Sequence, residues 1–85
     1  MAFSVVIENR AQKEFRKIPL PFNRAIRKSI DALELNPRPH GCKKLVASPD
    51  GHRVRIGDYR VLYTIDDRKS IVTIYRIRHR KDAYD

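Results

Sequence analysis

The fold is decided by residues 53–77, which read RVRIGDYRVLYTIDDRKSIVTIYRI. Arginine and aliphatic side chains alternate over residues 53–56, and a period of two residues is that of a β-strand whose two faces differ. The dipeptide Gly57-Asp58 is typical of a two-residue hairpin loop. Two further apolar runs follow, so the sequence predicts an antiparallel β-meander.

The two later strands of the meander cover residues 59–65 and 71–77, and residues 66–69 form the turn between them. With a two-residue first loop, Arg55 lies directly across the ladder from Arg60. Like charges in this position destabilise a sheet. Either the long side chains spread apart in solvent, or an anionic ligand supplies the countercharge.

Whether the later arginines join this face depends on the second turn. Arg76, Arg78 and Arg80 share one parity, opposite to that of Tyr75. A two-residue turn would place these arginines on the other face, whereas an odd loop over residues 67–69 with a bulge would bring them together. We expect the odd loop, and with it five or six guanidinium groups on one face, an arrangement suited to phosphate.

Two helices precede the meander. Residues 9–18 and 22–33 carry apolar side chains at helical spacing, with Asn9 as a plausible N-cap. Residues 3–7 favour a short strand, and residues 37–44 a basic loop. The fold class is therefore α+β, with an N-terminal strand, a two-helix hairpin and an antiparallel β-meander of three to four strands, and with the helices on one face of the sheet.

The chain is strongly basic. Lys and Arg number 19 against 10 Asp and Glu, and the net charge of +9 is spread over both halves of the sequence. This spread indicates a folded basic surface, whose partner is a polyanion: nucleic acid first, then an acidic protein segment, then a membrane. We expect no membrane span and no signal peptide. Cys42 is the single cysteine, which fits a reducing cytosol, and His40 with Cys42 is too few ligands for a metal site.

Several motifs resemble those of the RelE family within the RelE/ParE toxin superfamily. They are the Lys44-Leu45 dipeptide before the meander, DYRVLY at residues 58–63 and IRHRKDAY at residues 77–84. The resemblance runs over residues 1–85 as a single RelE-like toxin domain. It implies a compact fold like that of the microbial ribonucleases.

The resemblance also implies a function. Toxins of this family belong to type II toxin–antitoxin systems and are held inactive by a cognate RelB-like antitoxin, which we expect to be acidic or amphipathic and helical. They cleave mRNA in the A site of the 70S ribosome, in the cytoplasm and without a metal or cofactor, and so inhibit translation. The ribose 2′-hydroxyl attacks the adjacent phosphate and expels the 5′-oxygen.

Site residues follow from the same resemblance. The family's basic pair on the first meander strand corresponds to Arg53 and Arg55, and its phosphate-holding arginine to Arg60. Its arginine after the last strand, a general acid or charge stabiliser, corresponds to Arg80, and its base-stacking tyrosine to Tyr84. We expect the other basic residues of this region to bind RNA: Lys43, Lys44, Arg76, Arg78 and Lys81.

The basic pair departs from the family's pattern, in which it is lysine and a lysine is assigned as the general base. Arg53 and Arg55 can stabilise negative charge, but the pKa of a guanidinium is too high for it to release its proton and then serve as a base. His79 or His52 is then a candidate base, because histidine titrates near neutrality. The alternative is that ribosomal RNA groups or water take the proton.

Two other functions stay open. Toxins of the ParE branch share the fold implied by the resemblance and inhibit DNA gyrase without nuclease activity. They generally lack the set of basic catalytic residues. A non-catalytic RNA-binding module would bind phosphates with a steep dependence on salt. The arginine set together with Tyr84 favours the ribonuclease.

Overall fold

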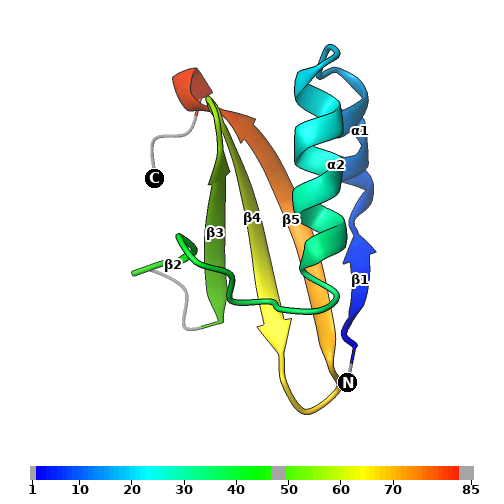
Figure 1. The fold of residues 1–85 in the computed structure, drawn as a ribbon, viewed down its shortest axis with the longest axis vertical. Coiled ribbons are helices and arrows are strands. Elements are labelled where there is room, and N and C mark those ends of the chain that lie inside the picture. Colours follow the sequence, from blue (N-terminus) through cyan, green and yellow to red (C-terminus); the bar gives the residue numbers. More distant parts are fainter. Residues whose placement is uncertain (1, 47–49, 83–85) are drawn as a thin grey trace.

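The structure is a computed structural model that describes residues 2–46 and 50–82 (Figure 1). Tyr84 lies outside these residues. The elements in chain order are β1 (Ser4–Ile7), α1 (Asn9–Arg16), α2 (Phe22–Ala32), β2 (Lys43–Lys44), β3 (Gly51–Ile56), β4 (Tyr59–Asp66), β5 (Ile71–His79) and the short 3₁₀ helix η1 (Arg80–Asp82). Within the described ranges, no helix is both long enough and apolar enough to cross a membrane.

The strands form one sheet in the order β1-β5-β4-β3-β2. Strands β2 to β5 are antiparallel neighbours, whereas β1 pairs with β5 in parallel. The two helices connect β1 to the rest of the sheet, as a parallel pair requires a long crossover. The predicted strand, helical hairpin and meander are confirmed, and the short strand β2 extends the meander at its far edge (Figure 1).

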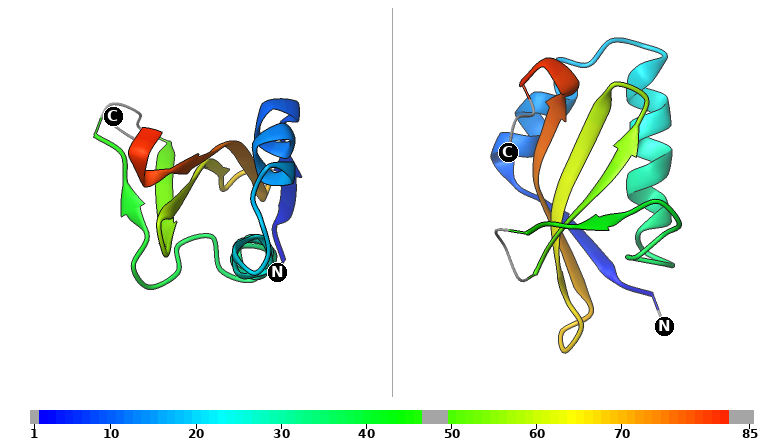
Figure 2. Two further views of the ribbon diagram at one scale, coloured as in Figure 1. Left: turned by 90° about the horizontal axis from the view of Figure 1, so that it is seen from above. Right: turned by 90° about the vertical axis from the view of Figure 1, so that its left-hand side faces the viewer.

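Both helices pack into one hydrophobic core beside the sheet. Figure 2 shows α2 lying along one side of the sheet and α1 beside β1 and β5. The buried side chains of the core come from both helices, from the residues just after them, and from β4 and β5: Ala11, Ile18, Ile26, Ile30, Leu33, Val61, Tyr63, Ile65, Val72, Ile74 and Ile77. The opposite side of β3, β4 and β5 is therefore left for other side chains.

The first hairpin is built as the sequence predicts. Gly57 has a φ of 58°, a left-handed conformation that suits glycine, and Ile56 pairs with Tyr59 across the two-residue loop. In this register Arg55 pairs directly with Arg60. The two arginines thus lie opposite each other on the face away from the core.

The prediction for the second turn was wrong in its detail. Asp66 pairs with Ile71, so the loop has four residues, an even number, and not the expected three. The parity changes further on, where the register shifts between Leu62 and Tyr63 and leaves Tyr75 as an extra residue in β5. This β-bulge, and not the loop, brings the arginines of β5 to the face that carries Arg55 and Arg60.

Two smaller expectations also need correction. Asn9 is the first residue of α1, and Glu8 occupies the N-cap position without a side-chain capping hydrogen bond. The predicted basic loop over residues 37–44 ends in β2, where Lys43 pairs with Arg53 and Lys44 with His52. Its last two residues are thus part of the sheet.

Candidate nucleic-acid interface

The side of the sheet away from the core carries basic side chains in two cross-strand rows. We call this side the arginine face. In one row Arg55, Arg60 and Arg78 lie side by side across β3, β4 and β5. In the adjacent row the ladder positions are Lys43, Arg53, Leu62 and Arg76. Cβ atoms of directly paired residues are about 5 Å apart, so the rows concentrate positive charge on a small area.

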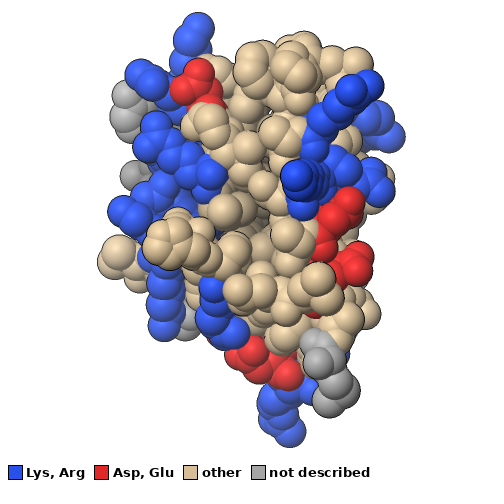
Figure 3. Space-filling view, in the orientation of Figure 1, with Lys and Arg blue, Asp and Glu red and all other residues tan. Residues whose placement is uncertain are grey.

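The space-filling view (Figure 3) is seen from the side of α2, so it shows the edge of the sheet and not the arginine face itself. In Figure 3, Lys and Arg atoms gather along the edge where β2 and β3 lie, with few acidic atoms among them. An uncharged strip separates this edge from the basic residues on the helices (Figure 3). The charge of +9 is therefore unevenly distributed over the surface.

Arg80 is held next to the arginine face by the first hairpin. Its backbone N–H donates to the carbonyl of Asp58 at 2.6 Å, and its guanidinium lies 3.6 Å from the Asp58 carboxylate. The Arg80 side chain is 63% exposed, so this ion pair leaves most of the guanidinium in solvent. In the same hairpin Arg55 Nε donates to the Gly57 carbonyl at 3.3 Å.

Arg76 is tied to α1 by a carboxylate. Glu14 accepts hydrogen bonds from Arg76 Nε at 3.0 Å and from the Ile77 N–H at 2.8 Å. The parallel ladder with β1 ends at Ile74, so the Ile77 N–H lies beyond the reach of that strand. Glu14 thus satisfies a backbone donor at an open sheet edge and neutralises Arg76 at the same time.

Arg78 is in a different situation. Its Nε atom is buried and has no hydrogen-bond partner in the structure as described. A buried guanidinium N–H without an acceptor costs free energy. Because this Nε atom has almost no accessible surface, a phosphate would bind Arg78 only through its terminal Nη groups.

The candidate base His79 does not lie on the arginine face. It pairs with Tyr59 and shares its parity with buried Ile77, so its ring points to the side of the helices. There it packs edge-on against Tyr59 at a centroid distance of 5.0 Å. The Lys81 N–H donates to His79 Nδ1 at 3.2 Å, which places the proton of the neutral ring on Nε2.

His52 lies on the same side as His79. It is 8% exposed, and its ring stacks on Tyr63 at 5.9 Å. Across the described part of the arginine face, the ionisable side chains of the two rows are arginine and lysine. The geometry therefore supports charge stabilisation there and supplies no histidine to accept a proton.

The remaining predicted RNA-binding residues are divided between the faces. Lys43 lies beside Arg53 and belongs to the arginine face, whereas Lys44 pairs with His52 and points the other way. Lys81 is exposed in η1, directly after Arg80. Tyr84 lies beyond the described residues, so its stacking role stays a prediction.

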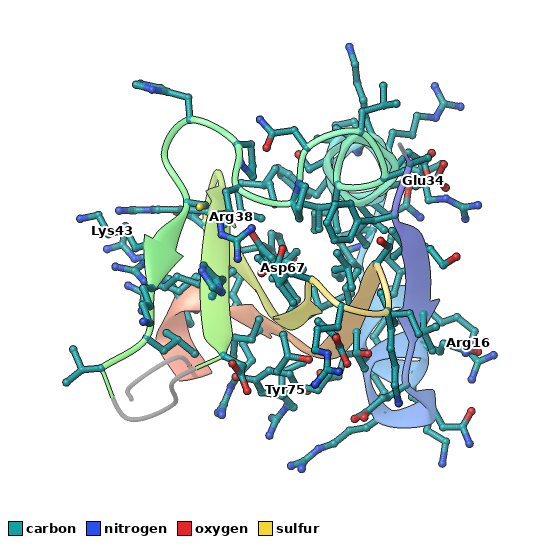
Figure 4. The ribbon with its side chains drawn as sticks, turned by 90° about the horizontal axis from the view of Figure 1, so that it is seen from below. Arg16, Glu34, Arg38, Lys43, Asp67 and Tyr75 are labelled. Atoms are coloured by element: carbon teal, nitrogen blue, oxygen red, sulfur yellow. The ribbon has the colours of Figure 1, made fainter. Side chains whose placement is uncertain are left out.

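Tyr75 is a residue that strand parity assigned to the wrong face. Because Ile74 and Ile77 on either side of the bulge are both buried in the core, Tyr75 and Arg76 both point outward. Figure 4 shows Tyr75 on the side of the sheet away from α2. The bulge thus adds an aromatic ring to the arginine face, and simple alternation over residues 71–77 has no signal for it.

The loop that leads into β2 is anchored at two points. The buried Tyr63 hydroxyl donates to the Pro37 carbonyl at 2.8 Å, and burial raises the pKa of this phenol well above its ordinary value. Arg38 binds Asp67 through two hydrogen bonds, of 3.2 and 2.8 Å (Figure 4). These hydrogen bonds lower the pKa of Asp67 and raise that of Arg38. Both anchors fix the path of the chain toward Lys43.

The side chains of this face are of the kind that can bind phosphate. Guanidinium groups are permanently charged and match a phosphate through two parallel hydrogen bonds. Placed around a reacting phosphate, they stabilise the negative charge that develops in the transition state. Among the described residues, no three His, Cys, Asp or Glu side chains come together as a metal site.

The comparison with known proteins gives the family. A family model described as "ParE toxin of type II toxin-antitoxin system, parDE" matches residues 5–84. The chain belongs to the RelE/ParE family of type II toxins. It is 36% identical over 89 residues to RelE1 of Methanocaldococcus jannaschii, which covers 99% of this chain and 97% of that protein.

Solved structures of RelE toxins share the fold. The toxin in the RelE–RelB complex of Pyrococcus horikoshii has a TM-score of 0.84 at 28% identity, covering 98% of this chain and 100% of the other. A free RelE variant from E. coli has a TM-score of 0.81 at 25% identity, covering 98% of this chain and 88% of the other. The toxin of the Mycobacterium tuberculosis RelBE2 complex has a TM-score of 0.80 at 27% identity, covering 93% of this chain and 99% of the other. The chain is thus a RelE-like toxin in sequence and fold.

Proposed function

We propose that this RelE-like toxin is a metal-independent endoribonuclease that cleaves mRNA in the ribosomal A site in the cytoplasm. The observation that carries the proposal is the row of Arg55, Arg60 and Arg78, three guanidinium side chains paired directly across three strands. A sheet gains no stability from like charges in adjacent positions. A polyanionic ligand accounts for the arrangement, and the resemblance to RelE toxins indicates that this ligand is RNA.

In the proposed reaction the 2′-hydroxyl of one nucleotide attacks the adjacent phosphate and expels the 5′-oxygen of the next. The products are a 2′,3′-cyclic phosphate and a 5′-hydroxyl. Arg60 holds the phosphate, Arg53 and Arg55 stabilise the charge of the pentavalent state, and Arg80 stabilises the leaving oxygen. Because His79 and His52 face the helices, we assign proton removal to water or to ribosomal RNA groups.

This assignment makes the ribosome part of the active site. A site without its own proton acceptor relies on the ribosome to align the 2′-hydroxyl with the phosphate, and alignment alone is worth several orders of magnitude in rate. Without the ribosome, RNA would still bind to the protein but would be cut poorly. The proposal therefore includes dependence on the ribosome.

A cognate antitoxin is the second proposed partner. The relatives from P. horikoshii and E. coli were solved as complexes with RelB. Here an antitoxin with acidic and apolar positions would cover the arginine face together with the uncharged strip of Figure 3. Phe22, which is 52% exposed and lies 6.0 Å from the Tyr59 ring, offers an apolar anchor for it.

Primer extension on a defined message tests the activity. The message is translated in a purified bacterial system with wild-type toxin, with Arg80→Ala, or with no toxin. We expect cuts within codons that require ribosomes and disappear in the variant. An intact message with normal translation would refute the proposed cleavage.

The match to a family model named for ParE supports gyrase inhibition as the second candidate. A supercoiling assay with purified DNA gyrase separates it from the first. Inhibition of supercoiling with no cleavage of mRNA would favour the ParE-like function. Salt-sensitive RNA binding without either effect would indicate a non-catalytic module.

A further inference from the structure

The outer half of β5 forms a free sheet edge. Strand β1 pairs only with Ile71–Ile74, so residues 75–79 have no strand on that side. Between this edge and the end of α1 lies a hollow of about 400 Å³, which we call the edge hollow. Its walls include Lys17 and Ile18, which follow directly after α1, and Arg78 and His79 from β5.

The charges around the edge hollow leave a positive excess. Glu14 and Arg76 both line it, and they neutralise each other through the 3.0 Å hydrogen bond. Lys17 is exposed and forms no ion pair with any residue that the structure describes. Arg78 also lines the hollow and forms no ion pair with any residue in the described ranges. The hollow therefore attracts an anion through Lys17 and Arg78.

The rest of the lining is aromatic, apolar and donor-rich. Ile18, Ile77 and the Tyr59 and His79 rings supply a surface against which a flat base can pack. The N–H of Ile77 points to this edge, since it donates to Glu14. In an antiparallel strand the N–H two residues further along points the same way, so the His79 N–H faces the edge too. An anionic group with an aromatic group attached fits this combination.

We propose that the edge hollow binds one nucleotide of single-stranded RNA, with its phosphate on Lys17 and Arg78 and its base against the Tyr59–His79 wall. Arg78 belongs both to the hollow and to the row of Arg55 and Arg60. An RNA strand held on the arginine face therefore continues over the edge of β5 into the hollow. The inference rests on the proposed RNA-binding function and extends the bound tract by at least one nucleotide.

The test measures binding of fluorescein-labelled 2′-O-methyl oligonucleotides, which cannot be cleaved because the nucleophile is blocked. Two- and six-nucleotide probes are titrated by fluorescence anisotropy against wild type, Lys17→Ala and Lys13→Ala. Lys13 is the matched control, because it is exposed on the same helix and does not line the hollow. Arg60→Ala reports on the arginine face.

We expect Lys17→Ala to weaken binding of the six-nucleotide probe about five- to tenfold and to reduce the slope of log affinity against log salt by about 0.7. Binding of the two-nucleotide probe and all binding by Lys13→Ala should stay within about twofold of wild type. If Lys17→Ala and Lys13→Ala change the affinity for the six-nucleotide probe equally while Arg60→Ala still weakens binding, the proposed site in the edge hollow is wrong but RNA binding on the arginine face stands. No binding by the wild type would overturn the hollow together with the proposed RNA-binding function.

NMR of the His79 ring adds a readout that does not depend on Lys17. The six-nucleotide probe should shift the imidazole resonances, whereas the two-nucleotide probe should not. An acidic peptide that shifts these resonances more strongly than the RNA does would contradict the proposal and indicate a protein partner for the hollow.

Discussion

Glu14 of α1 accepts a hydrogen bond from Arg76 Nε of β5 at 3.0 Å, across 62 residues of sequence. The same carboxylate accepts the Ile77 N–H at 2.8 Å. One side chain therefore fixes the strand just after the bulge that turns Tyr75 and Arg76 outward. The arrangement of the arginine face depends on a residue that is outside it.

Replacement of Glu14 tests this relationship. Glu14→Ala leaves the Ile77 N–H and Arg76 without their acceptor, and we expect the free energy of unfolding to fall by about 1–3 kcal/mol. Glu14→Gln keeps one acceptor oxygen and should show a smaller loss. Urea denaturation measures both, with exposed Glu8→Gln as the control. A loss in Glu14→Ala no larger than in Glu8→Gln would show that the contact does not hold the strand.

Arg60 and Arg80 should matter for activity and not for stability. We expect Arg60→Ala and Arg80→Ala each to lower the cleavage rate about 10²–10³-fold, through loss of charge stabilisation. Thermal unfolding temperature should stay equal or rise, because Arg60→Ala relieves like-charge crowding and the Arg80–Asp58 pair is exposed. Arg24→Ala on the exposed side of α2 is the control for loss of one arginine. Clear destabilisation in both variants would mean that these arginines are structural.

Tyr75 is expected to stack on an RNA base. Tyr75→Ala should weaken binding of a six-nucleotide 2′-O-methyl probe by at least about fivefold, since stacking of one base on an aromatic ring is worth about 1–3 kcal/mol. Tyr75→Phe keeps the ring and should bind within about twofold of wild type. If Phe is as defective as Ala in the anisotropy assay, the hydroxyl and not the ring is what matters.

The Arg38–Asp67 pair predicts a dependence of stability on pH. Hydrogen bonding to Arg38 lowers the pKa of Asp67 from 3.8 in the folded state, so the pair stabilises the fold above the unfolded pKa. This stabilisation is lost as the pH falls through the folded pKa. Asp67→Asn should therefore melt at a lower temperature than wild type at pH 7, and the difference should shrink as the pH falls through the folded pKa of Asp67. A difference in melting temperature that does not shrink as the pH is lowered, or that also occurs in exposed Glu34→Gln, would exclude this cause.

The sequence predicts much of this fold because alternation and turn residues are local signals. The Gly57-Asp58 loop fixes the register of Arg55 against Arg60, and the structure has that register. The sequence correctly predicts that the arginines of β5 join this face, but for the wrong reason, since the parity change occurs at Tyr75 inside β5 and not in the turn. The bulge is a feature of the pairing between β4 and β5, and Glu14, which holds the strand just after it, is 62 residues away from Arg76. Neighbouring residues in the sequence reveal neither.

The histidines illustrate the same limit at the candidate site. His79 precedes Arg80 in sequence, so it could be suspected as a base beside it. Strand alternation separates the two instead: His79 packs on Tyr59 toward the helices, and Arg80 begins η1 beside Asp58. The identity of a proton acceptor depends on side-chain direction, which composition and spacing do not provide.

The central claim is that the ribosome aligns a 2′-hydroxyl for attack while the arginine face stabilises the phosphate. The most direct measurement uses a short message on purified ribosomes, once as all-RNA and once with a single 2′-deoxy substitution at the nucleotide that is cut. We expect the all-RNA message to be cleaved to a 2′,3′-cyclic phosphate and a 5′-hydroxyl, and the substituted message to stay intact. Cleavage of the substituted message, or equal cleavage of the all-RNA message without ribosomes, would contradict the account.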